Sequence, residues 1–384
     1  MIISKTTEER TAERDRRLAL LNELMEETDV AAMVCHSTGG MAYQAEVKFM
    51  TDLYTPCNRL YSYMKKGEMP YTFAGRPDGH AGMCKKTFLP KENVIFTKDD
   101  LGLIVKWINE LPGEHPRVGV PSLPYIPLVM WDRLKQSKAE IVDISDAFTE
   151  KKAPKSEYEL SLLKYSCDLA VESFEEVVKF IKPGKTELEI IGMAEGFLRS
   201  RGALQLLVLC RSEMPHPYIG TPTTKKVEPD DIFVYSCEIA GPYGYWTQII
   251  RPIFLSRDSY KDTYDALQVT KEALEAGKEK FRPGNCIGDV AEAVEALVAK
   301  RHCTTGIWAG HGMGIDLGDG IAIARDNKME IKPNMILTMH PSVLNDVDGV
   351  LYSDTFMSTE GEAVNLTDKY TGSPYYEDLI KEIK

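Results

Sequence analysis

Phe180-Ile-Lys-Pro-Gly-Lys-Thr186 is repeated in similar form as Phe281-Arg-Pro-Gly-Asn285, and this repeat indicates how the second half of the chain folds. Pro-Gly marks a turn, the two prolines lie 283 − 183 = 100 residues apart, and each turn leads into a segment with helical spacing. A second pair, Val227-Glu-Pro-Asp-Asp-Ile-Phe-Val234 and Ile331-Lys-Pro-Asn-Met-Ile-Leu-Thr338, leads into strands and repeats with an offset of 333 − 229 = 104. These offsets indicate a duplicated helix–helix–strand unit. Such duplicates often pack about a pseudo-two-fold axis with a site between them.

A domain boundary is predicted in the charged, proline-bearing segment Glu150-Lys-Lys-Ala-Pro-Lys155. We therefore expect an N-terminal domain over residues 1–155 and a C-terminal domain over residues 156–384. Ser156 and Glu159 form the signature of a capping box just ahead of an apolar run, which predicts a helix start directly after the boundary.

The N-terminal domain is predicted to be a small α/β layer. Short apolar runs at 30–35, 93–97 and 117–120 alternate with helical patterns, as in α/β folds. The stretch 36–90 is rich in Gly, Tyr, Met and Pro and has weak periodicity. We expect long loops there, and long loops in compact domains are often functional. His80 lies in this stretch.

The composition is that of an ordinary acidic globular protein. Lysine and arginine number 46 against 58 aspartates and glutamates, which gives a formal net charge of −12. An acidic surface repels nucleic-acid phosphates and anionic membranes, so we expect neither as a partner. The eight cysteines form no C-x-x-C pair, and the N-terminus shows no apolar signal-peptide core. We expect a cytoplasmic protein.

Three strings in the second half resemble the creatinase and aminopeptidase P family: Ala309-Gly-His-Gly-Met-Gly314, Lys332-Pro-Asn-Met-Ile-Leu-Thr-Met-His-Pro341, and the hairpin Tyr235–Phe254 with Gly244-Tyr245 and Arg251. The resemblance extends over the whole chain, from a small N-terminal domain to the duplicated half. It implies a mixed α/β (α+β) protein whose C-terminal domain has the pita-bread fold with pseudo-two-fold duplication.

The metallopeptidases of this family hold two divalent ions with one histidine, two glutamates and two aspartates, a carboxylate-rich cage suited to hard cations. The matching positions here, taken in that order, are His311, His340, Ser353, Gln248 and either Cys237 or Glu238. The aspartate position given as Cys237 or Glu238 falls on Cys237 by ungapped count, and on Glu238 only if the hairpin is one residue shorter. The resemblance thus implies a member that lacks most metal ligands, as creatinase does, and we expect no metal and no other cofactor.

Without a Lewis acid, catalysis depends on groups that move protons and stabilise charge. His216 stands where the family places its substrate-side histidine, and imidazole gives and takes protons near neutrality. Glu238 is expected as general base or as the anchor of a substrate cation. His311 and His340 are expected to complete the catalytic set. The plain alternatives are a turn-forming histidine for His216, a solvated hairpin residue for Glu238, an ancestral remnant for His311 and a core histidine for His340.

Five further residues are expected to bind substrate: Gln248, Arg251, Tyr245, His80 and Ser353. Arg251 equally fits a role in tying strands together. In this family the N-terminal domain of one subunit often covers the active site of its partner. The resemblance therefore implies a homodimer with His80 or its loop near the pocket.

Together these features predict a metal-independent, creatinase-like hydrolase or lyase. It would cleave a C–N or similar bond of a small polar, zwitterionic molecule, with histidine as acid and base. Creatinase's own pair of substrate-binding glutamates is replaced by Ile250 and Ser353, which argues against creatine. The alternatives are a metal-dependent Xaa-Pro aminopeptidase-like peptidase with an atypical site, and a non-catalytic pita-bread protein that binds a peptide or protein.

Overall fold

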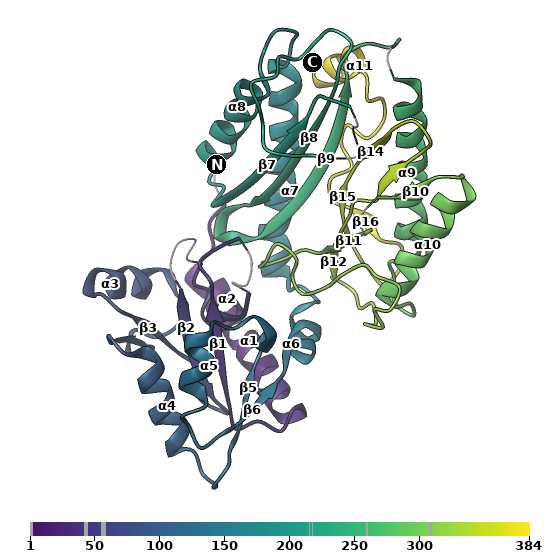
Figure 1. Ribbon diagram of the computed structural model, residues 1–384. Helices are drawn as coiled ribbons and strands as arrows, with labels where there is room; N and C mark the ends of the chain where they lie inside the picture. Colours follow the sequence, from purple (N-terminus) through teal and green to yellow (C-terminus); the bar gives the residue numbers. More distant parts are fainter. Residues whose placement is uncertain are drawn as a thin grey trace. The chain divides into compact units, whose positions relative to one another are not determined.

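The chain divides into two compact units, an N-terminal unit, Ser4–Ala153, and a C-terminal unit, Pro154–Lys384 (Figure 1). The predicted boundary, after residue 155, lies 155 − 153 = 2 residues beyond the boundary in the structure, which follows Ala153. The computed structural model describes residues 3–41, 45–54, 59–214, 216, 218–258, 260–306 and 309–384. Among these residues, no helix has the length and apolar character needed to cross a membrane.

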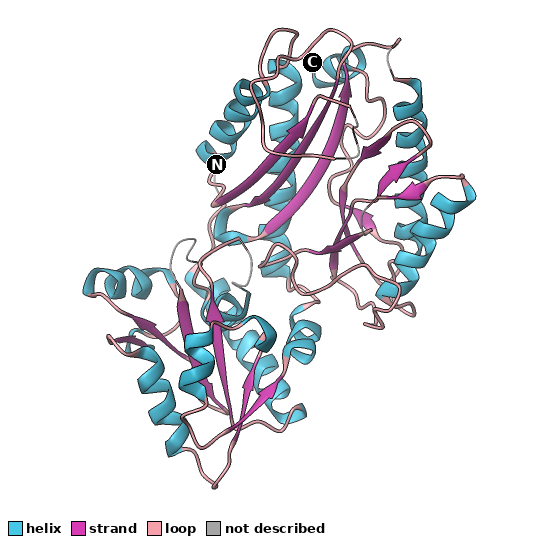
Figure 2. Ribbon diagram, in the orientation of Figure 1, coloured by secondary structure: helices cyan, strands magenta, loops and turns pink. Residues whose placement is uncertain are grey.

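Within its described residues, the N-terminal unit is built on a six-stranded mixed sheet of order β4-β3-β2-β1-β5-β6. Its strands are β1 Ala32–Ser37, β2 Leu60–Lys65, β3 Tyr71–Ala74, β4 Val94–Phe96, β5 Arg117–Val120 and β6 Glu140–Asp143. Its helices are α1 Thr7–Glu27, α2 Ala45–Thr51, α3 Pro77–Lys86, α4 Asp100–Glu110, α5 Leu128–Leu134 and α6 Ser145–Lys152. Ile104 of α4 and Met130 of α5 join a buried cluster with Val34 of β1, which places these helices on the sheet (Figure 2). The predicted α/β architecture is confirmed.

The expectation of long loops over 36–90 is wrong, because α2, β2, β3 and α3 all lie within this stretch. Strand β2 is an interior strand whose first five residues are all buried. A strand that is covered on both faces shows no alternation of apolar and polar residues. The sequence of β2 therefore lacks the two-residue periodicity by which a strand is recognised. His80 lies on helix α3 rather than in a loop.

The described residues of the C-terminal unit form two helix pairs, a final helix and three small sheets. The helices are α7 Glu157–Phe180, α8 Glu187–Ser200, α9 Lys261–Lys280, α10 Ile287–Lys300 and α11 Tyr376–Ile383. One sheet joins β7 Gln205–Arg211, β8 Ile232–Ala240 and β9 Trp246–Phe254. A second joins β11 Gly310–Gly312, β12 Ile336–Met339, β15 Asp354–Met357 and β16 Val364–Asn365, and a third joins β10 Thr304–Thr305, β13 Ser342–Leu344 and β14 Gly349–Leu351. Capping boxes at Ser156 and Thr186 start α7 and α8, since each satisfies two helix N–H groups.

The duplication is visible in the backbone hydrogen bonds that tie the start of each second helix to a later turn. Val227 N donates to Lys185 O at 2.8 Å, and Ile331 N donates to Asn285 O at 3.0 Å. The bridge Thr186↔Lys226 likewise has the counterpart Cys286↔Glu330. The offsets are 100 on the helix side and 104 on the turn side (285 − 185 = 100, 331 − 227 = 104). They equal the offsets between the repeated strings of the sequence.

The two copies join where β9 lies beside the segment that enters β15. Ile250 N donates to Ser353 O at 3.3 Å, and Ser353 N donates to Ile250 O at 3.1 Å. Further along, Trp246 N donates to Gly314 O at 2.7 Å. Figure 1 shows β9 of the first copy running alongside β15 of the second. We call this junction the seam.

Gly310 at the start of β11 provides a test of the close packing of β11 against β12. Its φ is +145°, and a Cβ there would lie 2.1 Å from Thr338 O on β12. We expect Gly310→Ala to lower the stability by about 2 kcal/mol or more, measured as a drop of roughly 4–8 °C in the melting temperature. Gly192→Ala on α8, where a Cβ meets nothing within 4 Å, should instead leave the melting temperature unchanged or raise it. Equal melting temperatures for Gly310→Ala and the wild type would contradict this packing.

Candidate functional site

A chain of buried polar side chains crosses the seam. Gln248 Nε2 on β9 donates to Glu238 Oε1 on β8 at 2.9 Å. Thr338 Oγ1 on β12 donates to Gln248 Oε1 at 3.0 Å, and Ser353 Oγ lies 2.9 Å from Thr338 Oγ1. None of the four side chains is more than 9% exposed. Both polar ends of the Gln248 amide therefore have hydrogen-bond partners, and Glu238 is the only ionisable residue among these four.

The strand register settles which residue of Cys237 and Glu238 faces this network. Glu238 lies opposite Gln248 in the β8–β9 pairing, whereas Cys237 lies opposite Ile249. Successive residues of a strand point to opposite faces, and Cys237 packs in the hydrophobic core. Burial raises the pKa of the Cys237 thiol to about 12. Cys237 is therefore a core residue, and Glu238 lies on the side of the seam.

The Glu238 carboxyl group has an environment suited to holding a proton near neutral pH. Burial raises its pKa to about 7, against a smaller lowering by the hydrogen bond from Gln248. Desolvation disfavours the charged form of an acid. Glu238 can therefore give or take a proton near neutrality, as an acid–base catalyst requires.

His311 and His340 form a second group next to the seam. His311 lies on β11, whose register places it opposite Thr338, and His340 directly follows β12. Their ring centroids are 5.1 Å apart in an edge-to-face arrangement, and His311 Nδ1 donates to Gly312 O at 3.0 Å. Burial lowers the pKa of both rings, and the neighbouring His311 helps to lower that of His340 to about 3. Two neutral imidazoles can accept and donate hydrogen bonds without adding charge.

His216 is buried on the connection between β7 and β8, and its partner is an aspartate. Its Nδ1 lies 2.6 Å from Asp348 Oδ2, and its backbone N–H donates to Asp348 Oδ1 at 3.0 Å. Asp348 is itself buried, and Thr263 Oγ1 donates to its Oδ2. Sequence reasoning missed Asp348 because it is 132 residues from His216. No local spacing signals such a contact.

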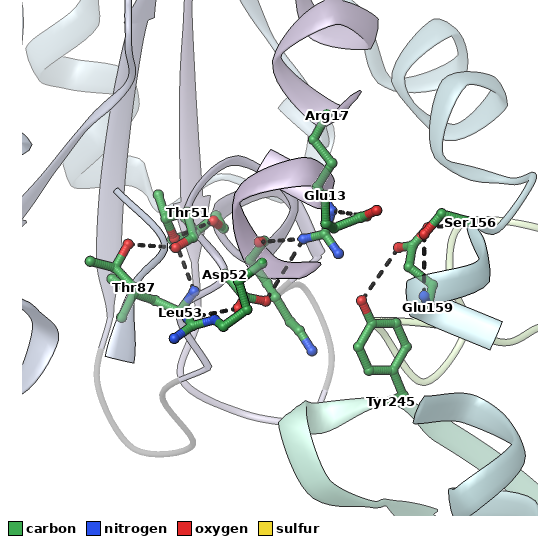
Figure 3. A network of polar contacts seen from close by, with 12 residues as sticks. Glu13, Arg17, Thr51, Asp52, Leu53, Thr87, Ser156, Glu159 and Tyr245 are labelled. Atoms are coloured by element: carbon green, nitrogen blue, oxygen red, sulfur yellow. Dashed lines mark hydrogen bonds and ion pairs between the residues drawn. The ribbon is translucent and has the colours of Figure 1, made fainter. Parts of the chain in front are cut away.

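Tyr245 and Arg251 are buried and bound to groups of the C-terminal unit. Tyr245 Oη donates to Glu159 Oε1 at 3.4 Å, near the capping box of α7 (Figure 3). The Arg251 guanidinium pairs with Asp354 and donates to Thr367 O at 2.8 Å. These contacts give both residues a role in holding the strands and α7 together. Figure 3 also shows the Glu13–Arg17 pair within α1 of the N-terminal unit.

His80 belongs to the N-terminal unit. Its Nε2 donates to Val94 O at 2.8 Å, which connects helix α3 to strand β4. Hydrogen bonds and ring contacts within the C-terminal unit connect candidate site residues in three groups. Glu238 is connected with Gln248 and Ser353, His311 with His340, and His216 with Asp348. Within the described ranges, no group of three or more His, Cys, Asp and Glu side chains is placed to hold a metal ion.

Comparison with known proteins gives the family context of this site. Residues 161–360, which are 200 of 384, match the model of metallopeptidase family M24. The uncharacterized peptidase YqhT of Bacillus subtilis is 26% identical over a region covering 58% of this chain and 65% of that protein, less than two thirds of its length. Creatinase of a Bacillus species is 23% identical over 96% of this chain and 93% of its own. The crystal structure of the prolidase from Pyrococcus horikoshii superposes with a TM-score of 0.76 at 17% identity, over 92% of this chain and 98% of that one. This last likeness shows the same fold.

Replacing Glu238 by glutamine tests its environment. The pKa of about 7 in the folded protein lies above the ordinary value of 4.5, so the folded state holds this proton more tightly than the unfolded state. The wild type therefore loses stability as pH rises from about 4.5 through 7, whereas Glu238→Gln does not. We expect the unfolding free energy of Glu238→Gln, relative to wild type, to increase by about 2–3 kcal/mol between pH 5 and pH 8.

Denaturant unfolding at the two pH values measures this difference. Glu292→Gln, at an exposed position of α10, is the matched control and should show no such change. A difference between Glu238→Gln and wild type that stays constant with pH would contradict the elevated pKa.

Proposed function

The chain belongs to metallopeptidase family M24, and from this premise we propose that it is a metal-independent hydrolase of a small polar molecule, cleaving a C–N bond. The observation that carries the proposal is the buried pair of His216 and Asp348, joined by a 2.6 Å contact. A histidine bound to a buried carboxylate is equipped to take and return a proton. It is the residue that the resemblance assigns to the substrate side.

The donor set at the seam supports metal-independent chemistry. Two hard divalent ions require several carboxylate oxygens, whereas the matching positions offer one carboxyl group, one amide, one hydroxyl and two imidazoles. The amide of Gln248 is also bound at both ends, to Glu238 and to Thr338. These residues do not fit a two-metal centre.

The proposed reaction uses His216 twice. As general base it accepts a proton from water while the water oxygen attacks the carbon of the scissile bond. As general acid it returns that proton to the departing nitrogen, so the C–N bond breaks and the amine leaves neutral. Glu238, near its pKa of about 7, can hold a cationic group of the substrate when ionised. The neutral His311, whose Nδ1–H already binds Gly312 O, can accept a hydrogen bond from the substrate at Nε2. The neutral His340 beside it adds no charge to the site.

Three alternatives remain distinct from this proposal. A C–S or C–C lyase would use the same groups to abstract a proton next to a carboxylate. A metal-dependent peptidase, as the name of the family implies, would need dications at the seam, and a pita-bread protein that only binds a peptide would need no proton transfer at all. The small-molecule substrate, the homodimer and the choice of hydrolase over lyase are all part of the proposal.

Metal analysis distinguishes the proposed metal-independent hydrolase from the metal-dependent peptidase. For protein purified without chelators, we expect well below one divalent ion per chain by elemental analysis. We also expect no change in melting temperature when EDTA or Mn²⁺ is added, since the donor set lacks bridging carboxylates. About two dications per chain, or a melting temperature that rises by several degrees with Mn²⁺, would favour the peptidase.

A substrate screen tests the catalytic role of His216. We expect one or more amidino, N-methyl or cyclic-amide compounds to raise the melting temperature and to be turned over. His216→Ala should then reduce kcat by about 10²–10⁴-fold, the usual contribution of a general acid–base. His115→Ala, at an exposed position of the N-terminal unit, should retain full activity. Full turnover by His216→Ala would refute the proposed role, and turnover of none of the bound compounds would favour the binding protein.

A further inference from the structure

We propose that Asp348 is the positioning residue of His216, holding its proton on Nδ1 so that Nε2 is the ring nitrogen that exchanges a proton with the substrate. The inference rests on the proposed function and adds a residue that lies in none of the matching strings. It starts from the way in which one carboxylate binds one histidine twice. Asp348 Oδ2 meets the ring at Nδ1, and Asp348 Oδ1 accepts the backbone N–H of the same residue.

These two contacts determine both the direction and the tautomer of the ring. With backbone and ring both anchored, the imidazole has little freedom to rotate about its side-chain bonds. An ionised carboxylate accepts hydrogen bonds and cannot donate them, so His216 Nδ1 must carry the hydrogen. In the neutral ring the lone pair is then on Nε2, and this is the atom that can act as a base.

The surroundings of Asp348 keep its carboxylate ionised. Burial raises its pKa, but hydrogen bonds from His216 and Thr263 and from the backbone N–H of Gly349 together lower the pKa below its ordinary value. When His216 accepts a second proton, the imidazolium lies against a negative charge in a buried place. A carboxylate in this position stabilises the imidazolium without itself taking the proton.

Asp348 is held in place by contacts that do not involve His216. Asn345 Oδ1 accepts the backbone N–H groups of Val347 and Asp348, each at 2.9 Å, which shapes the turn between β13 and β14. Asn345 Nδ2 donates to Asp262 O at 2.7 Å, so the turn is tied to the first residues of α9. Thr263, the next residue of α9, donates to Asp348. The position of the Asp348 carboxylate is therefore fixed by contacts other than those with His216.

The segment that carries His216 is anchored separately. Glu187, the first residue of α8, accepts from Ser212 N at 3.0 Å and Ser212 Oγ at 2.6 Å. It also accepts from Thr223 N at 3.0 Å and Thr223 Oγ1 at 2.7 Å. One buried carboxylate thus holds both ends of the segment 212–223, and the Tyr260 ring lies edge-to-face on His216 at 5.2 Å. Two independent anchors place the histidine and the aspartate against each other.

Asp348→Asn in the full-length protein tests the inference with a nearly isosteric change. The asparagine can still accept the backbone N–H of His216, but its NH₂ group then faces Nδ1. It would force the hydrogen to Nε2, as happens when the aspartate of a catalytic triad is replaced by asparagine. We expect ¹⁵N NMR of the His216 ring at pH 8 to show the hydrogen on Nδ1 in the wild type and on Nε2 in Asp348→Asn. We expect kcat on a hit from the screen to fall by about 10³–10⁴-fold with KM little changed.

Matched variants separate positioning from general stability. Asp346→Asn, an exposed neighbour in the same turn, should leave the ring tautomer and kcat unchanged. Thr263→Val removes one donor to Asp348, and we expect it to lower kcat by up to about tenfold, whereas Thr263→Ser, which keeps the hydroxyl, should retain at least half of the wild-type kcat. An Asp348→Asn protein with wild-type tautomer and wild-type kcat overturns the inference.

The inference and the proposed function fail in different ways. If His216→Ala keeps full turnover, the proposed function fails, whatever the tautomer. If His216→Ala is inactive but Asp348→Asn is fully active, only the role of Asp348 fails. Should Asp348→Asn not fold, the wild-type spectrum decides, because a hydrogen on Nε2 of wild-type His216 at pH 8 would mean that Asp348 does not hold Nδ1–H.

Discussion

The backbone pairing of Ile250 with Ser353 is the constraint on which the rest of the C-terminal unit depends. Its two hydrogen bonds, 3.3 and 3.1 Å long, join a strand of the first copy to the segment that enters β15 in the second. Once this register is set, Gln248 must lie two residues from the junction, within reach of both Glu238 and Thr338. Arg251 on β9 then pairs with Asp354 on β15, which adds an ion pair across the seam. The seam is thus a structural joint whose geometry also collects the polar groups of the candidate site.

The buried groups of the site carry little charge, in contrast to the acidic composition of the chain. The formal net charge is −12, but burial holds His311 and His340 neutral by lowering their pKa values and allows Glu238 to be protonated near pH 7. The cost of burying a charge without a partner explains this pattern, because groups in such places shift their pKa and become neutral instead. Asp348 is the contrasting case, in which several hydrogen bonds lower the pKa of a buried carboxylate.

Local signals predicted the regular elements well where the physics is local. The predicted capping box at Ser156 starts a helix one residue later, because the side chain and the helix N–H groups that it satisfies lie within three residues of each other. The prediction of long loops over 36–90 is wrong, since burial of β2 on both faces depends on strands and helices from elsewhere in the chain. The choice between Cys237 and Glu238 was open for the same reason. It depends on a one-residue register between β8 and β9, and a one-residue shift exchanges the two faces of a strand.

From the sequence alone came the duplicated half, the family resemblance and the residue types at the ligand positions. Repeated turns, spacings and residue identities are written along the chain and need no coordinates. Three features required the folded structure: Glu238 rather than Cys237 faces Gln248, Arg251 and Tyr245 bind groups of the fold itself, and His216 has Asp348 as its partner. Each of these depends on contacts between residues far apart in the chain or on strand register. Such contacts form only when the whole unit has folded, so no local pattern can report them.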